Sequence, residues 1–303
     1  MKLHTKDLLT LEELTSKELL GIIDFAIKLK TELKKGRTKP ILKDKTLAMI
    51  FQKPSTRTRV SFETGMFQLG GHALNLSSSE LQLSRGETAE DTARTLSRYV
   101  DIVMARVYEH QMIETLAKNS TVPVINGLSN SFHPCQTLAD LMTIKEKKKL
   151  KGIKIAWIGD GNNVCNSLIH GCSTLGIDVS IATPRGYEPD NNVIKKSKNK
   201  ISLEIIQNPD EAVRNADVVM TDTFTSIHNI DKSREKKFLP KYQVNPSLMK
   251  KAKTNAIFMH CLPAKREKEV TSSVIDGPQS VVWDQAENRL HTQKSLMASL
   301  LGI

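Results

Sequence analysis

Short apolar segments alternate with amphipathic helical stretches along almost the whole chain, and this alternation limits the possible folds more than any other feature. In the first half, helical stretches such as 57–69 and 87–99 separate apolar segments, which are TLAMIF (46–51), HALNL (72–76), DIVMAR (101–106) and VPVIN (122–126). Strands that alternate with helices in this way form parallel sheets with helices on both faces. The sequence therefore predicts an α/β fold.

A second series of the same kind follows a lysine-rich segment at 145–152. Its apolar segments are KIAWIG (154–159), DVSIA (178–182), SLEII (202–206), ADVVMT (216–221), AIFMH (256–260) and SVVWD (280–284). We expect two doubly wound parallel-sheet domains with the active site in the cleft between them. The first would contain residues 1–146, joined by a closing helix at about 287–303, and the second residues 147–286.

The net charge of +11 has two interpretations, a nucleic-acid-binding face or a solvated surface on a protein that binds small anions. Aromatic residues are only 5% of the chain and do not lie among the lysine clusters, which favours the second. No apolar run approaches the roughly 18 residues of a membrane helix, and the N-terminus lacks the apolar core of a secretory signal. Four cysteines do not form a disulfide scaffold at this length, so we expect a cytoplasmic protein with no membrane partner.

Open parallel sheets bind ligands beyond the carboxyl ends of their strands, so the residues after each strand are the candidates for a site. Residues 55–58, Ser-Thr-Arg-Thr, follow the first strand where a loop enters a helix. Hydroxyl groups, free backbone N–H groups and an arginine at a helix N-terminus favour an anion such as phosphate. Arg106 ends the third strand and His133 follows the fourth. Taken singly, each is more often a surface ion pair or a structural loop histidine.

The strand ends of the second half carry amides, a carboxylate and a thiol. Gly159-Asp160-Gly161-Asn162-Asn163 resembles the start of a dinucleotide fingerprint, but Val164 stands where the third glycine belongs, so the evidence for a dehydrogenase is weak. Asp222 suits an ammonium group, although a helix cap or ion pair explains it equally well. Cys261 follows His260 directly, and adjacent side chains usually diverge, so the pair predicts no Cys-His dyad.

Seven segments together resemble the aspartate/ornithine carbamoyltransferase family, and among its members the ornithine enzymes. They are FQKPSTRTRVSFE (51–63), LQLSRGETAEDTARTLSRYVD (81–101), FHPCQTLAD (132–140), WIGDGNNVCNSL (157–168), DVVMTDT (217–223), FMHCLPAKR (258–266) and DQAENRLH (284–291). The resemblance implies a homotrimer with shared active sites that makes L-citrulline and phosphate from carbamoyl phosphate and L-ornithine. It also implies that no organic cofactor is used. The pairs His133/Cys135 and His260/Cys261 do not match structural zinc spacings, so we expect no metal.

The resemblance also implies a role for each matching residue. Carbamoyl phosphate would contact Ser55, Thr56, Arg57, Thr58, Arg106, His133, Gln136, Cys261, Leu262 and Arg289, with Gln82 reaching in from a neighbouring subunit. Ornithine would contact Asn163, Asp222, Ser226 and Ile227. The residues implied in catalysis are Arg57, Arg106, His133 and Cys261.

One segment departs from the pattern of the ornithine enzymes. Ser226-Ile227-His228 stands where they carry Ser-Met-Gly, and this loop contacts the second substrate. Isoleucine is stiffer than methionine, and histidine adopts positive φ less readily than glycine. Putrescine or an N-acylated ornithine therefore remains an alternative acceptor, although Asp222 argues for a free α-amino group. The distant alternative is a basic α/β protein that binds nucleic acid.

Overall fold

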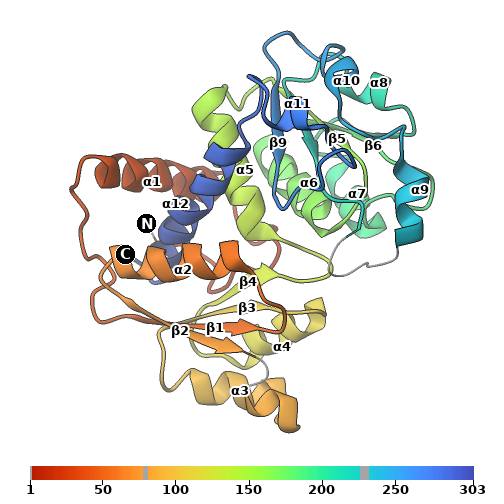
Figure 1. The fold of residues 1–303 in the computed structure, drawn as a ribbon. Coiled ribbons are helices and arrows are strands. Elements are labelled where there is room, and N and C mark those ends of the chain that lie inside the picture. The colour runs from red at the N-terminus through yellow and green to blue at the C-terminus, as the bar shows by residue number, and fades with distance from the viewer. Residues whose placement is uncertain (1, 78–80, 226–231) are drawn as a thin grey trace. The chain divides into compact units, whose positions relative to one another are not determined.

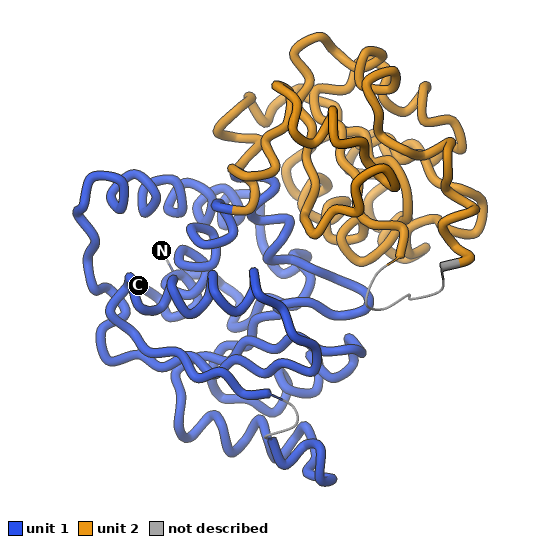
Figure 2. Tube along the Cα trace, viewed as in Figure 1, with its two compact units in different colours: residues 1–142, 287–303 blue, residues 143–286 orange. Residues whose placement is uncertain are grey.

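The structure is a computed structural model that describes residues 2–77, 81–225 and 232–303. The chain forms two compact units (Figure 2): unit 1 contains residues 1–142 and 287–303, and unit 2 contains residues 143–286. One boundary falls inside helix α5 (Pro134–Lys147) and the other inside helix α12 (Val282–Leu300).

Unit 1 is built on a sheet of four parallel strands in the order β2-β1-β3-β4. Its strands are β1 (Thr46–Phe51), β2 (His72–Ser77), β3 (Ile102–Arg106) and β4 (Val124–Leu128). Its helical elements are α1 (Ser16–Lys34), α2 (Thr56–Gln68), η1 (Gln82–Arg85), α3 (Ala89–Leu96), α4 (His110–Asn119) and most of α5 and α12. Figure 1 shows α2 on one face of the sheet and α3 and α4 on the other. The residues of β3 and β4 are all buried, as expected for strands covered on both faces.

Unit 2 is built on a sheet of five parallel strands in the order β7-β6-β5-β8-β9. Its strands are β5 (Lys154–Ile158), β6 (Asp178–Ala182), β7 (Leu203–Ile206), β8 (Val218–Thr221) and β9 (Ile257–His260). Its helical elements include α6 (Asn163–Leu175), α7 (Asn191–Ser197), α8 (Pro209–Val213), η2 (Lys232–Arg234), α9 (Glu235–Phe238), α10 (Pro246–Met249) and α11 (Ser272–Ile275). Apolar side chains of the sheet, of α8 and of α10 form a hydrophobic core of this unit.

Two α/β units with parallel sheets confirm the predicted fold class, and nine of the ten predicted strands are present. The predicted strand SVVWD (280–284) is wrong. Only Ser280 pairs with the sheet, through a single bridge to Phe258, and α12 begins at Val282. Asp284 lies in the first turn of this helix, where the helix dipole favours a negative charge.

Helix α12 buries polar side chains against the rest of unit 1. Lys294 is 1% exposed, and its ammonium group donates to Gln68 Oε1 at 2.9 Å. Lys30 of α1 donates to Asn288 Oδ1 at 2.8 Å, and His291 Nε2 lies 3.4 Å from Glu287. Burial lowers the pKa of Lys294 to about 8. The predicted closing helix is therefore confirmed, and it is held partly by buried hydrogen bonds.

We expect the protein to become more stable as the pH rises from about 8 towards 10.5, the ordinary pKa of lysine. In this window the unfolded chain still binds a proton at Lys294 and the folded chain does not, so the free energy of unfolding increases with pH. Lys294→Met should remove this increase, which amounts to about 3 kcal/mol. Urea unfolding of wild type and variant across this range measures the difference. Lys251→Met, at a surface ion pair, should keep the wild-type pH dependence.

Candidate active site

The strand order places the polar segments of unit 1 at neighbouring strand ends. Strand β1 lies next to β3, and β3 next to β4, so the segments that follow these three parallel strands leave the same edge of the sheet. The segment after β1 carries Ser55–Thr58 and the one after β4 carries His133, while Arg106 is the last residue of β3 itself. Phe51, the last residue of β1, is the register partner of Arg106. The sheet topology therefore gathers residues that are far apart in the sequence.

Helix α2 presents its N-terminus at this edge. Ser55 is the N-cap: its hydroxyl oxygen accepts from the backbone N–H of Thr58 at 3.3 Å, and the hydroxyl donates to Thr58 Oγ1 at 3.1 Å. Thr58 is fully buried, whereas Thr56 and Arg57 are exposed in the first turn. Because the helix dipole and the exposed first-turn donors favour negative charge, this turn can hold an anion, and Arg57 can add its guanidinium group.

Lys53 adds a cation that the sequence analysis missed. It is 7% exposed, and its ammonium group lies 3.9 Å from the centre of the Tyr108 ring. Burial, and secondarily the charge of Arg106, lowers the pKa of Lys53. Arg106 is itself buried at the end of β3, and its carbonyl oxygen accepts from the Gln52 N–H at 2.9 Å. The available signal was a lysine two residues after the end of a buried strand and two residues before Ser55.

Arg289 and Gln136, which the sequence predicted as site residues, are hydrogen-bonded to each other. Arg289 Nη1 donates to Gln136 Oε1 at 2.8 Å, and Gln136 Nε2 donates to Asp140 Oδ1 at 2.8 Å. Arg289 Nε donates to Gln293 Oε1 at 3.0 Å. All four side chains are buried, so this network fixes the guanidinium group without the help of solvent.

The same network reaches the first turn of α2. Gln293 Nε2 donates to Ser61 Oγ at 2.8 Å, and the Ser61 hydroxyl donates to the Arg57 carbonyl oxygen at 2.6 Å. Arg57 and Arg289 are thus connected through α2 and α12.

His133 and Gln82 differ in their surroundings. His133 is 5% exposed and immediately precedes α5, and its carbonyl oxygen accepts from the Gln136 N–H at 3.0 Å. Gln82 is exposed in η1, and its side chain forms no hydrogen bond with any residue that the structure describes. The backbone of His133 is therefore linked to Gln136, whereas Gln82 is exposed to solvent in η1.

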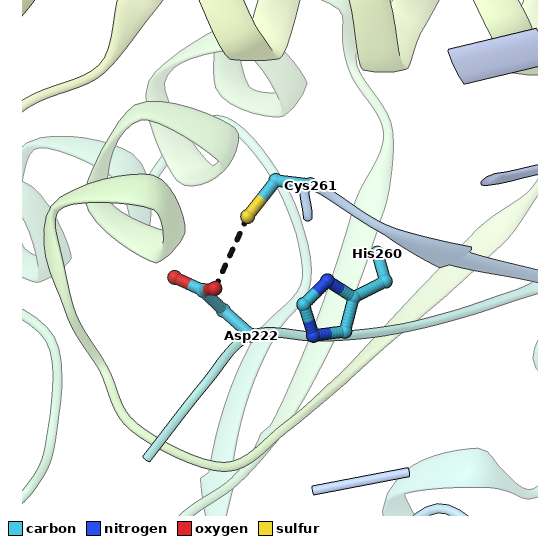
Figure 3. Close-up of side chains that lie close together, drawn as sticks. All are labelled: Asp222, His260 and Cys261. Carbon is cyan, nitrogen blue, oxygen red and sulfur yellow. Dashed lines mark hydrogen bonds between the residues drawn. The ribbon is translucent and has the colours of Figure 1, made fainter. Parts of the chain in front are cut away.

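In unit 2, Asp222 is the centre of the polar group. It follows β8, between the ends of β5 and β9, and is 7% exposed. Asn162 Nδ2 donates to Asp222 Oδ2 at 2.7 Å, and Cys261 Sγ donates to Asp222 Oδ1 at 3.1 Å (Figure 3). The Thr223 N–H donates to the same oxygen at 2.7 Å. These donors orient the carboxylate and stabilise its negative charge, which suits an ammonium group.

His260 points near this carboxylate but has other partners (Figure 3). Ligand atoms of Asp222, His260 and Cys261 lie within 4.8 Å of one another, a spacing that could hold a metal ion. However, His260 Nδ1 accepts from the Leu262 N–H at 2.9 Å, and Nε2 lies 3.2 Å from Glu269 Oε1. Because both ring nitrogens are engaged, the ring offers no lone pair to a metal or to Cys261. The absence of a metal stays a prediction.

The Gly-x-Gly turn after β5 has a structural explanation. The Gly161 N–H donates to the Tyr187 carbonyl oxygen at 2.8 Å, and a Cβ at Gly161 would lie 2.3 Å from Pro189 N. Close approach of the neighbouring backbone therefore requires this glycine and occupies the N–H group that a pyrophosphate would need. The turn does not support the dehydrogenase interpretation.

The remaining predicted residues of unit 2 are of three kinds. Asn163 is the first residue of α6, and Asn162, which the sequence analysis did not choose, is the residue that binds Asp222. Leu262 is partly buried and has a left-handed backbone conformation, with φ of 56°. Ser226 and Ile227, with His228, lie outside the described residues.

All four cysteines are free: Cys135, Cys165 and Cys172 are buried, and Cys261 is partly buried. Burial raises the pKa of the Cys135 thiol to about 11, so this thiol is inert at neutral pH. No helix in the described part of the chain is long and apolar enough to cross a membrane.

Comparisons with known proteins agree with this geometry. Residues 6–146 match the family model described as "Aspartate/ornithine carbamoyltransferase, carbamoyl-P binding domain", and residues 151–300 match the model of the "Asp/Orn binding domain" of the same proteins. The chain is 62% identical over 302 residues to the ornithine carbamoyltransferase of Cenarchaeum symbiosum, covering 99% of each. It is 54% identical over 309 residues to the Pyrococcus furiosus protein named "Ornithine carbamoyltransferase, anabolic", covering 100% of this chain and 98% of that one.

Solved structures give the same result. The ornithine carbamoyltransferase structure from Pyrococcus furiosus aligns with a TM-score of 0.94 at 55% identity, covering 98% of this chain and 97% of that one. The Thermus thermophilus structure aligns with a TM-score of 0.90 at 41% identity, covering 98% and 99%.

Proposed function

The chain belongs to the aspartate/ornithine carbamoyltransferase family, and we propose that it transfers the carbamoyl group of carbamoyl phosphate to the δ-amine of L-ornithine. The products are L-citrulline and phosphate. The observation that carries the proposal is the similarity of the whole chain to relatives named ornithine carbamoyltransferase. The two polar groups support it, because one is cationic and the other centres on a carboxylate.

In the proposed mechanism, unit 1 binds carbamoyl phosphate. The phosphate lies against the first turn of α2, where it contacts Ser55, Thr56, Arg57 and Thr58 together with Arg289. Arg106 and His133 hold the carbonyl oxygen, which gains negative charge as the amine attacks, and Gln136 holds the carbamoyl amide. Lys53 adds positive charge beside Arg106. We propose that Gln82 completes the site of a neighbouring subunit in a homotrimer.

Unit 2 binds the acceptor in this proposal. Asp222 binds the α-ammonium group, with Asn163, Ser226 and Ile227 beside the amino-acid end and Cys261 and Leu262 near the reacting atoms. The neutral δ-amine attacks the carbamoyl carbon, and the bond from this carbon to the phosphate oxygen breaks. The proton released by the amine goes to the leaving phosphate, and the Cys261 thiol lies in a hydrogen bond with Asp222. No cofactor takes part.

We place the enzyme in the cytoplasm and in arginine biosynthesis. The name of the Pyrococcus furiosus relative, which includes the word anabolic, supports the second assignment. Basic nucleic-acid binding is not favoured, because the whole chain is similar to relatives named ornithine carbamoyltransferase.

A panel of acceptors tests the proposed substrate. With carbamoyl phosphate as donor, kcat/KM for L-ornithine should exceed the value for putrescine, N-acetylornithine, L-lysine or L-aspartate by about 100-fold or more. Putrescine lacks the amino-acid end, and N-acetylornithine lacks the charge that Asp222 binds. Colorimetric measurement of the carbamoylated product gives the rates. Faster turnover of putrescine than of ornithine would overturn the acceptor assignment.

A further inference from the structure

Arg234 connects segments that follow three different strands of unit 2. Its Nη2 lies 2.6 Å from Asp160 Oδ2, in the turn after β5. The guanidinium carbon lies 4.7 Å from the centre of the Tyr187 ring, after β6, and 5.9 Å from that of Phe238, in α9. The two charged side chains are only 15% and 17% exposed. A partly buried ion pair supported by aromatic rings is more strongly held than a surface pair.

Asp160 lies in the same turn as the residue that orients Asp222, the proposed binding residue for the α-ammonium group. Asp160 lies two residues before Asn162, whose side chain donates to Asp222 Oδ2 at 2.7 Å. Burial raises the pKa of Asp160 to about 6, Arg234 lowers it, and the charge of Asp222 raises it. The charge of Asp222 therefore makes ionisation of Asp160 less favourable, and Arg234 offsets part of this cost.

Phe238, the aromatic partner of Arg234, packs against the segment that follows Asp222. The Phe238 ring stacks on Phe224, with ring centres 4.5 Å apart and 10° between the planes. Phe224 lies two residues after Asp222 and is 1% exposed. Arg234 therefore contacts both the turn that orients the Asp222 carboxylate and the aromatic stack that packs the backbone following it.

We propose that Arg234 is a positioning residue for the acceptor: through Asp160 and Phe238 it fixes Asp222, and it keeps the Asp160 carboxylate negatively charged so that both carboxylates attract the α-ammonium group. The inference rests on the proposed function, because it assumes that Asp222 binds this group. The charged and titratable groups that face Asp160 are Arg234 from η2, Asp222 after β8 and the Cys165 thiol of α6.

Steady-state kinetics of the full-length enzyme tests the proposal. Arg234→Gln should raise KM for ornithine about tenfold and leave KM for carbamoyl phosphate unchanged, and Arg234→Lys should recover most of the loss. The matched control is Arg266→Gln, which removes an exposed ion pair with Asp276 in the same unit and should change neither KM.

The pH profile separates positioning from a general loss of structure. Without Arg234 the pKa of Asp160 rises above its value of about 6. When the pH is lowered, Asp160 is then protonated at a higher pH than in wild type. The increase of KM for ornithine should therefore begin at a higher pH in Arg234→Gln than in wild type. This shift should disappear in the double variant Arg234→Gln/Asp160→Asn, which has no carboxylate at position 160. A purely structural role of Arg234 would not move the profile.

Each outcome is decisive. The inference is overturned if wild-type enzyme carbamoylates ornithine and Arg234→Gln has an unchanged KM for ornithine and an unchanged pH profile. This result leaves the proposed function intact. Wild-type enzyme with no activity on ornithine overturns both. If circular dichroism shows that Arg234→Gln does not fold, Asp160→Asn carries the test, because the inference requires a raised KM for ornithine in that variant as well.

Discussion

Arg57→Ala should reduce kcat/KM for carbamoyl phosphate by about 10³-fold while the protein stays folded. Arg57 is exposed in the first turn of α2, so its removal leaves no cavity in the core. The loss arises because the Arg57 guanidinium group can form two hydrogen bonds to the oxygens of the phosphate, which gains negative charge as it leaves. Initial rates at varied carbamoyl phosphate, with ornithine saturating, measure the effect.

Helix α2 offers a matched control two residues further on. Arg59 is also exposed, and its Nε donates to Glu63 at 2.9 Å, so it points along the helix surface. Arg59→Ala should keep the rate within about twofold of wild type, since a surface ion pair within a helix contributes little. Equal rates for the two variants would refute the assignment of the phosphate to the N-terminus of α2.

Asp222→Asn should raise KM for ornithine by about 100-fold and leave the affinity for carbamoyl phosphate unchanged. The substitution keeps the shape of the side chain and removes its charge, so the α-ammonium group of the acceptor loses its partner. Asn162 and Cys261, which donate to this carboxylate, lose a charged acceptor at the same time. Kinetics at varied ornithine and calorimetric titration of carbamoyl phosphate measure the two effects separately.

The control for this variant is Asp210→Asn, at a surface ion pair with Lys251 in the same unit. It should leave both substrates unaffected. A KM for ornithine within about threefold of wild type in Asp222→Asn would show that the ammonium group binds elsewhere. The loss of a buried ionic partner should weaken binding by more than about threefold.

Much of the fold could be predicted from the sequence, because the strands of a parallel sheet covered on both faces are short apolar runs with no polar alternation. Segments such as TLAMIF and KIAWI carry this signal directly. SVVWD carries it too and nevertheless forms the start of a helix. A run of two valines and a tryptophan does not indicate whether a neighbouring strand is available to pair with it. The position of such a strand depends on the tertiary fold.

The site residues could be predicted where they follow strands, because parallel strands end at one edge of a sheet. The predictions at Ser55–Thr58 and Asp222 used this rule, and the roles given to these residues stay predictions. The rule does not say which of two adjacent asparagines faces Asp222, because that depends on how α6 begins. Nor does it indicate that Arg234 reaches Asp160, 74 residues away, or that His260 directs both ring nitrogens to structural partners.

The discontinuity of unit 1 has a consequence for the nascent chain. Residues 287–303 leave the ribosome only after all of residues 143–286, so the continuous unit 2 can fold while unit 1 still lacks α12. Until then Gln136 has no Arg289 to bind, and Lys30 has no Asn288. The half proposed to bind the acyl donor therefore cannot complete its fold until the half proposed to bind the acceptor has been synthesised.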